Sequence, residues 1–208
     1  MIGRRHFQCI AWTMVRRIVG TIASGLLLGA ATAQGMTLVP GQPITVLIPG
    51  ESMTTTLSLD TAGISGTGAG VRVHFDSTLI SNLTLTEVLS RSNLGVASPQ
   101  TDQFSLDGDP QTDMYVLVSW IEASGDWPGT SAADLFDLSV TAAPGFNTDT
   151  SVNVSTLTPP GVDLTAQSLR LLTTTSTTDS DSDGMPDTFE LQFAFDPLNG
   201  ADAALDFD

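Results

Sequence analysis

The sequence predicts a mainly β fold, a two-sheet antiparallel β-sandwich followed by a linker and a short acidic segment. Hydrophobic residues make up 41% and charged residues 14% of the 208 residues, with 19 Gly and 11 Pro, a composition typical of loop-rich β proteins. Short apolar–polar alternations run from residue 36 to residue 172, and clusters of Gly, Pro and Asp separate them. The length allows one good-sized domain and a small appendage.

Residues 1–33 have the pattern of a secretory signal peptide. Four arginines and an apolar stretch at 18–28 precede the small residues 31–33, an expected cleavage site before Gln34. An uncleaved membrane anchor is the alternative, but the apolar stretch is interrupted by glycine and serine and falls short of the ~20 residues that a spanning helix needs. We therefore expect an exported protein, secreted or held at the cell surface, with no membrane insertion after cleavage.

The chain beyond this leader is strongly acidic. It contains 3 arginines, no lysine and 23 acids, so its formal charge falls from −16 to −20. Such a surface repels nucleic acids and anionic lipids and attracts divalent cations. The single cysteine, Cys9, lies in the leader. The expected sandwich, residues 34–172, therefore has no disulfide and must be stabilised by burial of its core.

Alternation predicts the first strands in order. They are expected at 43–49, 53–59 and 70–77. The last of these places its apolar side chains on one face and His74 on the polar face, so His74 is expected to face solvent. The stretch 79–94 fits neither the strand nor the helix period cleanly, and we expect a strand followed by a loop.

The second half of this region continues the pattern. Both faces of 114–121 are bulky, which predicts a strand at the centre of its sheet. Further strands are expected at 135–140, 151–157 and 163–172. About seven to nine short strands with turn residues between them predict a sandwich.

The composition changes after residue 172. Residues 173–178 are all Thr or Ser, a low-complexity run that indicates a flexible linker. Residues 179–208 then carry nine acids and no base. Within them, residues 179–190 fit the pattern D-x-D-x-D-G-x-x-D-x-x-E at every fixed position.

This spacing is that of a calcium-binding loop. Ca²⁺ takes about six to eight oxygen ligands, and a loop of about twelve residues supplies them from positions 1, 3, 5, 7, 9 and 12. Gly184 occupies position 6, where the chain must turn sharply. The expected ligands are the side chains of Asp179, Asp181, Asp183, Asp187 and Glu190 and the backbone carbonyl of Met185.

A solvated acidic tail is the alternative interpretation of this loop. It explains neither the glycine at position 6 nor the apolar residues that follow the loop. Because the carboxylates repel one another in the absence of a cation, we expect the loop to become ordered only when metal binds. The loop has no His or Cys, which disfavours zinc, and its ligands are too many and too flexible for magnesium.

The C-terminal segment resembles the thrombospondin type 3 calcium repeats of secreted bacterial proteins, an EF-hand-like loop without a preceding helix. As in those repeats, an aromatic segment and a D-P-x-N element, residues 196–199, follow the loop. Residues 206–208 look like the opening of a second loop. The resemblance implies a calcium repeat over 179–208 whose second loop is truncated.

Residues 36–172 resemble cohesin and carbohydrate-binding sandwich modules. The motifs are Gly50-Glu51-Ser52 before an alternating strand, residues 71–76 in an early strand and residues 135–140 in a late one. The resemblance implies a jelly-roll-like sandwich of about nine strands. It also implies recognition of a protein or a glycan without catalysis.

No active site is predicted, so we expect no enzyme. Nucleophilic catalysis needs an activated Ser or Cys with a base, but beyond the leader His74 is the single histidine and there is no cysteine or lysine. No pair of carboxylates has a spacing that singles it out for glycoside hydrolysis. Asp107, Asp109 and Asp113 are candidates for a second ion, although Asp-Gly and Asp-Pro turns explain them as well.

Trp127 is the candidate ligand-binding residue of the sandwich. It lies in a loop of Gly, Asp and Pro, where an exposed ring would stack on a sugar. Burial against the edge of the sandwich is the alternative, and it is the one that we favour.

The sequence thus predicts a secreted or cell-surface calcium-binding protein with a non-catalytic adhesion or recognition module. Its expected partners are Ca²⁺ and an extracellular glycan or surface protein. One alternative is a carbohydrate-binding accessory module of a secreted polysaccharide hydrolase. The other is a cohesin-like scaffold module in an extracellular assembly.

Overall fold

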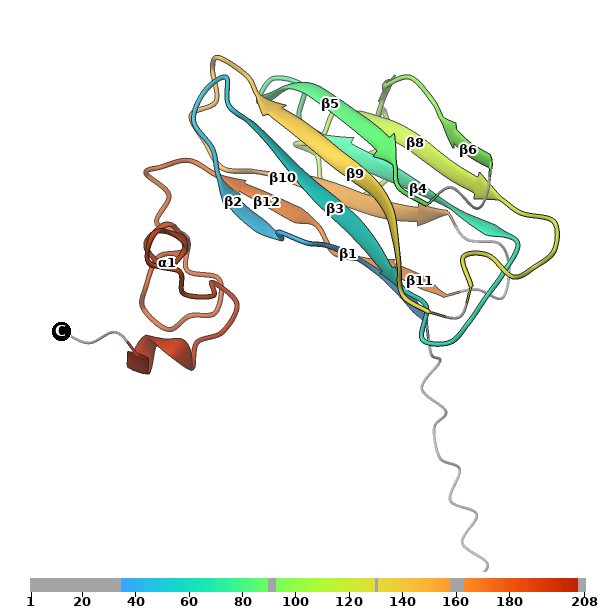
Figure 1. Ribbon diagram of the computed structural model, residues 1–208. Helices are drawn as coiled ribbons and strands as arrows, with labels where there is room; N and C mark the ends of the chain where they lie inside the picture. Colours follow the sequence, from blue (N-terminus) through green and yellow to red (C-terminus); the bar gives the residue numbers. More distant parts are fainter. Residues whose placement is uncertain (1–34, 90–92, 130, 158–162, 206–208) are drawn as a thin grey trace, which may run out of the picture. The chain divides into compact units, whose positions relative to one another are not determined.

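Two β-sheets face each other and enclose a hydrophobic core (Figure 1). The computed structural model describes residues 35–89, 93–129, 131–157 and 163–205. The predicted signal peptide, residues 1–33, and the predicted opening of a second loop, residues 206–208, lie outside this part of the chain. Within it, no helix is both long and apolar enough to cross a membrane.

Short strands and two short helices make up the described residues. The strands are β1 (Met36–Pro40), β2 (Ile44–Val46), β3 (Ser52–Asp60), β4 (Gly68–Phe75), β5 (Ile80–Glu87), β6 (Asn93–Val96), β7 (Gln100–Thr101), β8 (Met114–Ile121), β9 (Ala133–Ala142), β10 (Thr150–Leu157), β11 (Leu164–Ala166) and β12 (Leu169–Leu172). The helices follow the last strand and are α1 (Asp187–Phe193) and the 3₁₀ helix η1 (Asp202–Leu205).

The sheet order confirms the predicted two-sheet sandwich. The five-stranded sheet has the order β11-β1-β3-β9-β5, and the seven-stranded sheet has the order β2-β12-β10-β4-β8-β6, with β7 also paired to β8. Two pairs, β1–β11 and β2–β12, are parallel, whereas the sequence predicts antiparallel pairing throughout. The reason is that the chain changes sheets between β1 and β2 and again, in the same direction, between β11 and β12.

Each strand predicted from alternation is present, with ends shifted by a few residues. The ambiguous stretch 79–94 contains β5 and the beginning of β6. The predicted strand 163–172 is two strands, because the chain crosses between the sheets near Gln167. Strands β1 and β7 were not anticipated, since five and two residues are too few for a clear alternation.

Aromatic side chains form part of the core. Trp120 of β8 lies with its ring centroid 5.6 Å from that of Trp127 and 5.8 Å from that of Phe136 of β9. Trp127 is 2% exposed, so the prediction that it binds a ligand is wrong and burial is confirmed. Its loop folds back because Gly66 and Trp127 exchange two backbone hydrogen bonds, of 2.8 and 2.9 Å, which place the ring against the core.

The Thr/Ser run 173–178 is attached to the sandwich. Asp149, which lies just before β10, accepts hydrogen bonds from Thr173, Ser176 and Thr178. The structure therefore differs from the flexible linker that the composition predicts. The run donates its hydrogen bonds to one carboxylate, Asp149, which is more than 20 residues earlier in the sequence. Composition alone cannot predict such a contact.

The central place of Phe136 in the core generates a stability prediction. Phe136→Ala removes a side chain that is 0% exposed, and truncation of a buried phenylalanine costs about 3–5 kcal/mol. Phe104→Ala is the matched control, because Phe104 is 80% exposed and should change the free energy of unfolding by less than about 0.5 kcal/mol. Urea denaturation measures both values, and equal losses in the two variants would contradict the described core.

Candidate metal centre and buried polar network

The loop 179–190 folds around its own aspartates. The carboxylate of Asp179 accepts the backbone N–H groups of Ser182, at 2.7 Å, and Gly184, at 3.0 Å. Gly184 has φ +102°, a conformation that favours glycine, as expected for position 6. The carboxylate of Asp183 accepts the N–H of Met185 at 2.8 Å. These bonds turn the loop so that its carboxylates converge.

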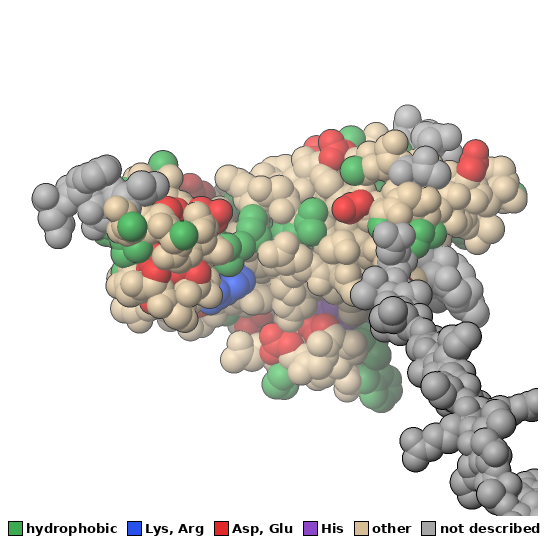
Figure 2. Space-filling model, turned by 90° about the horizontal axis from the view of Figure 1, so that it is seen from below, with side chains coloured by type: hydrophobic (Ala, Val, Ile, Leu, Met, Phe, Trp, Pro, Cys, Tyr) green, Lys and Arg blue, Asp and Glu red, His purple; other side chains and the backbone are tan. Residues whose placement is uncertain are grey.

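Carboxylate oxygens from three parts of the segment meet at one place. Ligand oxygens of Asp179, Asp181 and Asp183 lie within 4.8 Å of one another, and so do those of Asp183, Glu190 and Asp202. Figure 2 shows acidic side chains gathered on this segment, with a basic side chain beside them. Asp183 belongs to both groups, so they form one cluster.

The cluster contains buried oxygens that accept no hydrogen bond from the described residues. Glu190 is 0% exposed, and neither of its carboxylate oxygens has a partner. One oxygen of each of three neighbours is in the same state: Asp181 Oδ2, Asp183 Oδ2 and Asp202 Oδ1. A buried polar atom without a partner costs about 1–3 kcal/mol, and more when it is charged, so this arrangement is unfavourable for the protein alone.

The pKa values of the cluster also indicate that its charged form is unfavourable in the protein alone. Burial, followed by repulsion from Asp181, Asp183 and other neighbouring carboxylates, raises the pKa of Glu190 to about 7. Burial also raises the pKa of Asp181, with added repulsion from Asp183 and Asp179. A bound cation would oppose both pKa shifts, because its positive charge stabilises the ionised form of the buried carboxylates.

Two residues of the segment, Asp187 and Asp202, differ from the ligand set predicted from the sequence. Asp187, the expected ligand at position 9, is not among the carboxylates whose oxygens lie within 4.8 Å of one another, and it accepts hydrogen bonds from the N–H and hydroxyl groups of Ser180. Asp202 joins the cluster instead, although sequence reasoning did not select it. The feature of the sequence that could have indicated Asp202 is the D-P-x-N element, residues 196–199. After this element the chain turns back toward the loop, and Gly200 lies close to Asp183. Ligation by the Met185 carbonyl stays a prediction.

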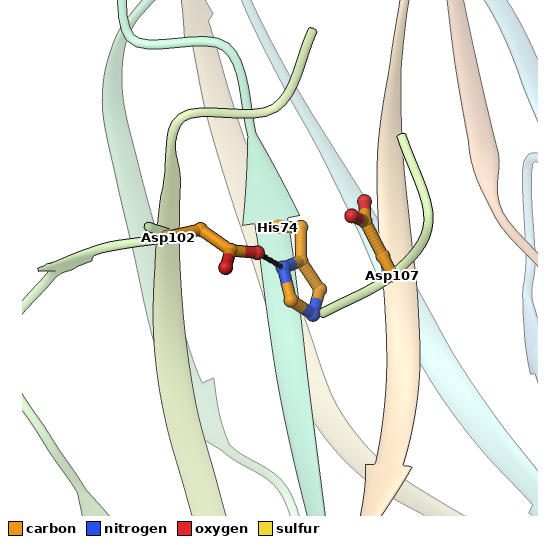
Figure 3. Close-up of side chains that lie close together, drawn as sticks. All are labelled: His74, Asp102 and Asp107. Atoms are coloured by element: carbon orange, nitrogen blue, oxygen red, sulfur yellow. Dashed lines mark hydrogen bonds and ion pairs between the residues drawn. The ribbon is translucent and has the colours of Figure 1, made fainter. Parts of the chain in front are cut away.

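A second polar network surrounds His74, which is 0% exposed (Figure 3). Its Nδ1 lies 2.9 Å from Asp102 Oδ2, and its Nε2 lies 2.7 Å from the hydroxyl of Ser155. Asp102 also accepts the backbone N–H groups of Phe104 and Leu106. The prediction that His74 faces solvent is therefore wrong. The connection between β7 and β8 folds over the outer face of β4 and covers it, which strand alternation cannot reveal.

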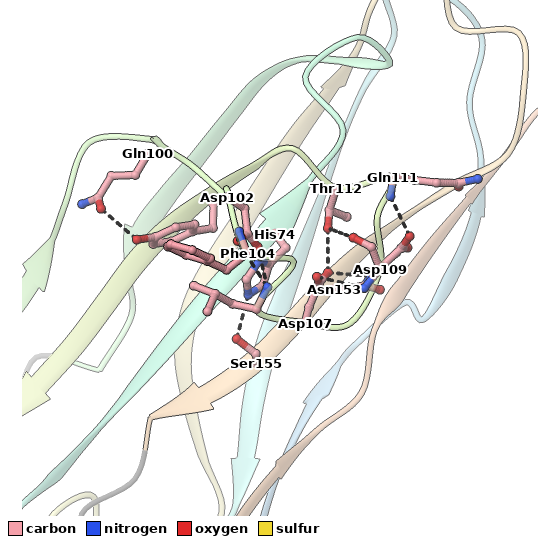
Figure 4. Close-up of polar contacts among 12 residues, drawn as sticks. His74, Gln100, Asp102, Phe104, Asp107, Asp109, Gln111, Thr112, Asn153 and Ser155 are labelled. Carbon is pink, nitrogen blue, oxygen red and sulfur yellow. Dashed lines mark hydrogen bonds and ion pairs between the residues drawn. The ribbon is translucent and has the colours of Figure 1, made fainter.

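Asp107 and Asp109 belong to the same covering loop (Figure 4). Asp107 accepts hydrogen bonds from Thr112, at 2.8 Å, and from Asn153 of β10, at 2.9 Å. Burial raises the pKa of Asp107, but these hydrogen bonds, a backbone N–H and nearby His74 outweigh it and hold the pKa below its usual value. Asp109 also accepts from Asn153, whereas Asp113 accepts from Ser77. These aspartates therefore have structural partners.

The His74 network is best interpreted as structural. Atoms of His74, Asp102 and Asp107 lie within 4.8 Å of one another, a spacing that a metal site would also have. Ser155, His74 and Asp102 are bonded in the order of a hydrolytic triad. However, the ring is fully enclosed and each of its nitrogens already has a partner. The network holds the covering loop on the sheet and leaves no free ligand atom on the histidine.

The same outer face carries a groove beyond the covering loop. It has a volume of about 710 Å³ and is lined by residues of β4, β8 and β10, among them Gly68, Gly70 and Leu117. Two apolar side chains border it: Ile121 is 70% exposed and Leu157 is 37% exposed. Exposed apolar side chains around a concave surface are typical of sites that bind another molecule.

Comparisons with known proteins give structural likeness alone. No known family profile matches the sequence, and no curated protein matches it. A non-cellulosomal cohesin from Archaeoglobus fulgidus is 9% identical, with 67% of this chain and 91% of that chain covered and a TM-score of 0.45. The cohesin CaCohA2 of Clostridium acetobutylicum is 10% identical, with 69% and 94% covered and a TM-score of 0.44.

A chain of a type I cohesin–dockerin complex of Clostridium thermocellum is 9% identical, with 67% of this chain and 93% of that chain covered and a TM-score of 0.49. At these values the likeness carries no argument about what the protein binds.

The role of Asp102 generates a second stability prediction. Asp102→Ala leaves His74 and two backbone N–H groups without their buried acceptor, which should lower the free energy of unfolding by at least about 2 kcal/mol. Asp163→Ala is the control, because Asp163 is exposed, and it should have an effect below about 0.5 kcal/mol. Chemical denaturation gives both values; a loss no greater for Asp102→Ala than for the control would refute the network.

Proposed function

We propose that the protein is an exported calcium-binding protein whose segment 179–205 holds Ca²⁺ and whose sandwich recognises another protein. The observation that carries the proposal is the carboxylate of Glu190. It is fully buried among other carboxylates, and neither of its oxygens has a hydrogen-bond partner among the residues that the structure describes. Burial of a charged carboxylate without a partner lowers the stability of a protein unless a bound cation compensates the charge.

The donor set fits calcium. The carboxylates of Asp179, Asp181, Asp183, Glu190 and Asp202 would hold the ion. If Glu190 binds with both oxygens, these residues give about six oxygen ligands, within the range that Ca²⁺ takes. Hard carboxylate oxygens with no nitrogen or sulfur donor favour calcium over zinc. The bound ion would supply charge and cross-linking, a structural role.

Export is consistent with this chemistry. The leader pattern of residues 1–33 predicts secretion, and extracellular calcium modules function with dissociation constants of about 10⁻⁴–10⁻³ M. The formal charge of −20 beyond the leader attracts divalent cations and disfavours binding to nucleic acids or anionic membranes.

Calcium titration of the purified chain tests the site. We expect Ca²⁺ to bind to the wild-type protein at millimolar or lower concentration by isothermal titration calorimetry. Glu190→Gln keeps the size of the side chain but removes its charge, and Asp202→Asn does the same, so each should weaken binding by at least about tenfold. Asp163→Asn, an exposed carboxylate outside the cluster, should bind as the wild type does. Absence of binding to the wild type at millimolar Ca²⁺ would overturn the proposal.

A specific observation also favours protein recognition by the sandwich. The groove on β4, β8 and β10 is bordered by exposed Ile121 and Leu157, which suit an apolar side chain of a partner protein. A glycan is the weaker candidate, because sugar binding uses exposed aromatic rings and Trp120, the aromatic residue that lines this groove, is 2% exposed.

Selection of peptides from a displayed random library tests this recognition surface. We expect the enriched peptides to share an apolar residue and to bind Ile121→Asp at least about tenfold more weakly than the wild type, because the charge would be buried in the groove. Val88→Asp is the control, since Val88 is 44% exposed and does not line the groove. Equal binding to both variants, or specific binding on a glycan array alone, would contradict protein recognition at this face.

A further inference from the structure

Helix α1 carries two buried carboxylates with different neighbours. Glu190 belongs to the acidic cluster. Asp187, three residues earlier, is also 0% exposed. It accepts two hydrogen bonds from Ser180, one from the backbone N–H at 2.7 Å and one from the hydroxyl at 2.6 Å. Its Oδ2 lies 3.7 Å from Nη1 of Arg170 in β12. A helix of seven residues thus joins the acidic cluster to the seven-stranded sheet.

Arg170 is the basic partner that the sandwich contributes. It is paired in register with Ile44 of β2, the edge strand that α1 contacts. Its guanidinium also donates a hydrogen bond to the hydroxyl of Ser180, within the acidic loop. Arg72, by contrast, is on β4, which β10 separates from β12, and lies over the ring of Tyr115 at 5.7 Å from the centroid.

Asp149 provides a second attachment between the two parts. It accepts the N–H of Thr173 at 2.8 Å and the hydroxyls of Ser176 at 2.6 Å and Thr178 at 3.3 Å. Burial raises the pKa of Asp149, but these hydrogen bonds outweigh it and hold the pKa below its usual value. The carbonyl of Thr178 in turn accepts the N–H of Asp187 at 2.7 Å, which connects the two attachments.

We propose that calcium binding and the docking of residues 173–205 on the sandwich are one linked equilibrium, in which Arg170 is a positioning residue that holds Asp187 on the sheet and away from the ion. This inference rests on the proposed calcium site. Because binding free energies are reciprocal, an ion that favours the docked segment is itself bound more tightly by it.

The physical reason for the linkage lies in the shared helix. Without a cation, ionised Glu190 is unfavourable in its buried position, and exposing it to water requires α1 to move. Asp187 is on the same short helix. A movement of α1 would therefore break the contacts of Asp187 with Ser180 and Arg170. With calcium bound, Glu190 is fixed and Asp187 is placed on the sheet. Calcium would thereby set the position of the segment against β2 and β12.

Hydrogen–deuterium exchange of the full chain, with and without millimolar Ca²⁺, tests the linkage. In the wild type, calcium should slow the exchange of β12 amides by at least about fivefold, the lower end of typical coupling between two sites. Arg170→Met should abolish this slowing and weaken calcium binding by a similar factor. Arg72→Met is the matched control, because Arg72 contacts Tyr115 instead of the loop, and it should keep the slowing. Exchange of β4 and β8 in the same samples reports whether each variant is folded.

Asp187→Asn provides a second variant that keeps the shape of the side chain. It should lose the calcium-dependent slowing at β12 and weaken calcium binding about as much as Arg170→Met does, which is less than Glu190→Gln does. Calcium binding with unchanged exchange at β12 in the wild type would overturn the linkage and leave the calcium site standing. Equal losses of affinity in Asp187→Asn and Glu190→Gln would make Asp187 a ligand, and would also overturn it. Absence of calcium binding to the wild type would instead overturn the proposed function.

Discussion

Repulsion between buried carboxylates is the constraint on which the C-terminal segment depends. Oxygens of Asp183, Glu190 and Asp202 lie within 4.8 Å of one another, and within the described part of the chain neither oxygen of Glu190 has a hydrogen-bond donor. Removing such charges from water costs several kcal/mol each, by order of magnitude, unless opposite charge is near. A divalent cation turns this repulsion into attraction. The turn at Gly184 and the backbone bonds to Asp179 hold the loop in the shape in which its carboxylates converge.

The two polar clusters of the protein differ in how their hydrogen bonds are satisfied. Around His74, both ring nitrogens have partners, and Asp102 accepts backbone N–H groups as well, so the cluster is complete without a ligand. Around Glu190, the buried oxygens are unpaired. In both clusters, atoms that could bind a metal ion lie within 4.8 Å of one another. The state of the hydrogen bonds thus distinguishes the network around His74, which is complete, from the acidic cluster, for which we propose a bound ion.

Alternation and loop spacing were sufficient to predict the sandwich and the acidic loop, because both signals are local. Strand 114–121 pairs with neighbours on both sides, β4 on one and β6 and β7 on the other, but it lies next to the edge of its sheet, not at its centre, and only one of its two bulky faces is fully buried. The residues that sequence reasoning missed depend on contacts between distant segments. His74 is covered by a loop about 30 residues later, a distance that strand periodicity cannot register. Asp202 joins the cluster because the chain returns after the loop, whereas the carboxylate of Asp187 accepts hydrogen bonds from Ser180.

The calcium site is tested most directly by anomalous diffraction from crystals grown with millimolar CaCl₂. We expect one anomalous peak at about 2.3–2.6 Å from both carboxylate oxygens of Glu190, with Asp181, Asp183 and Asp202 among the other ligands. Asp187 should remain beside Arg170. A structure at this calcium concentration with no anomalous peak between these carboxylates would contradict the proposed calcium site.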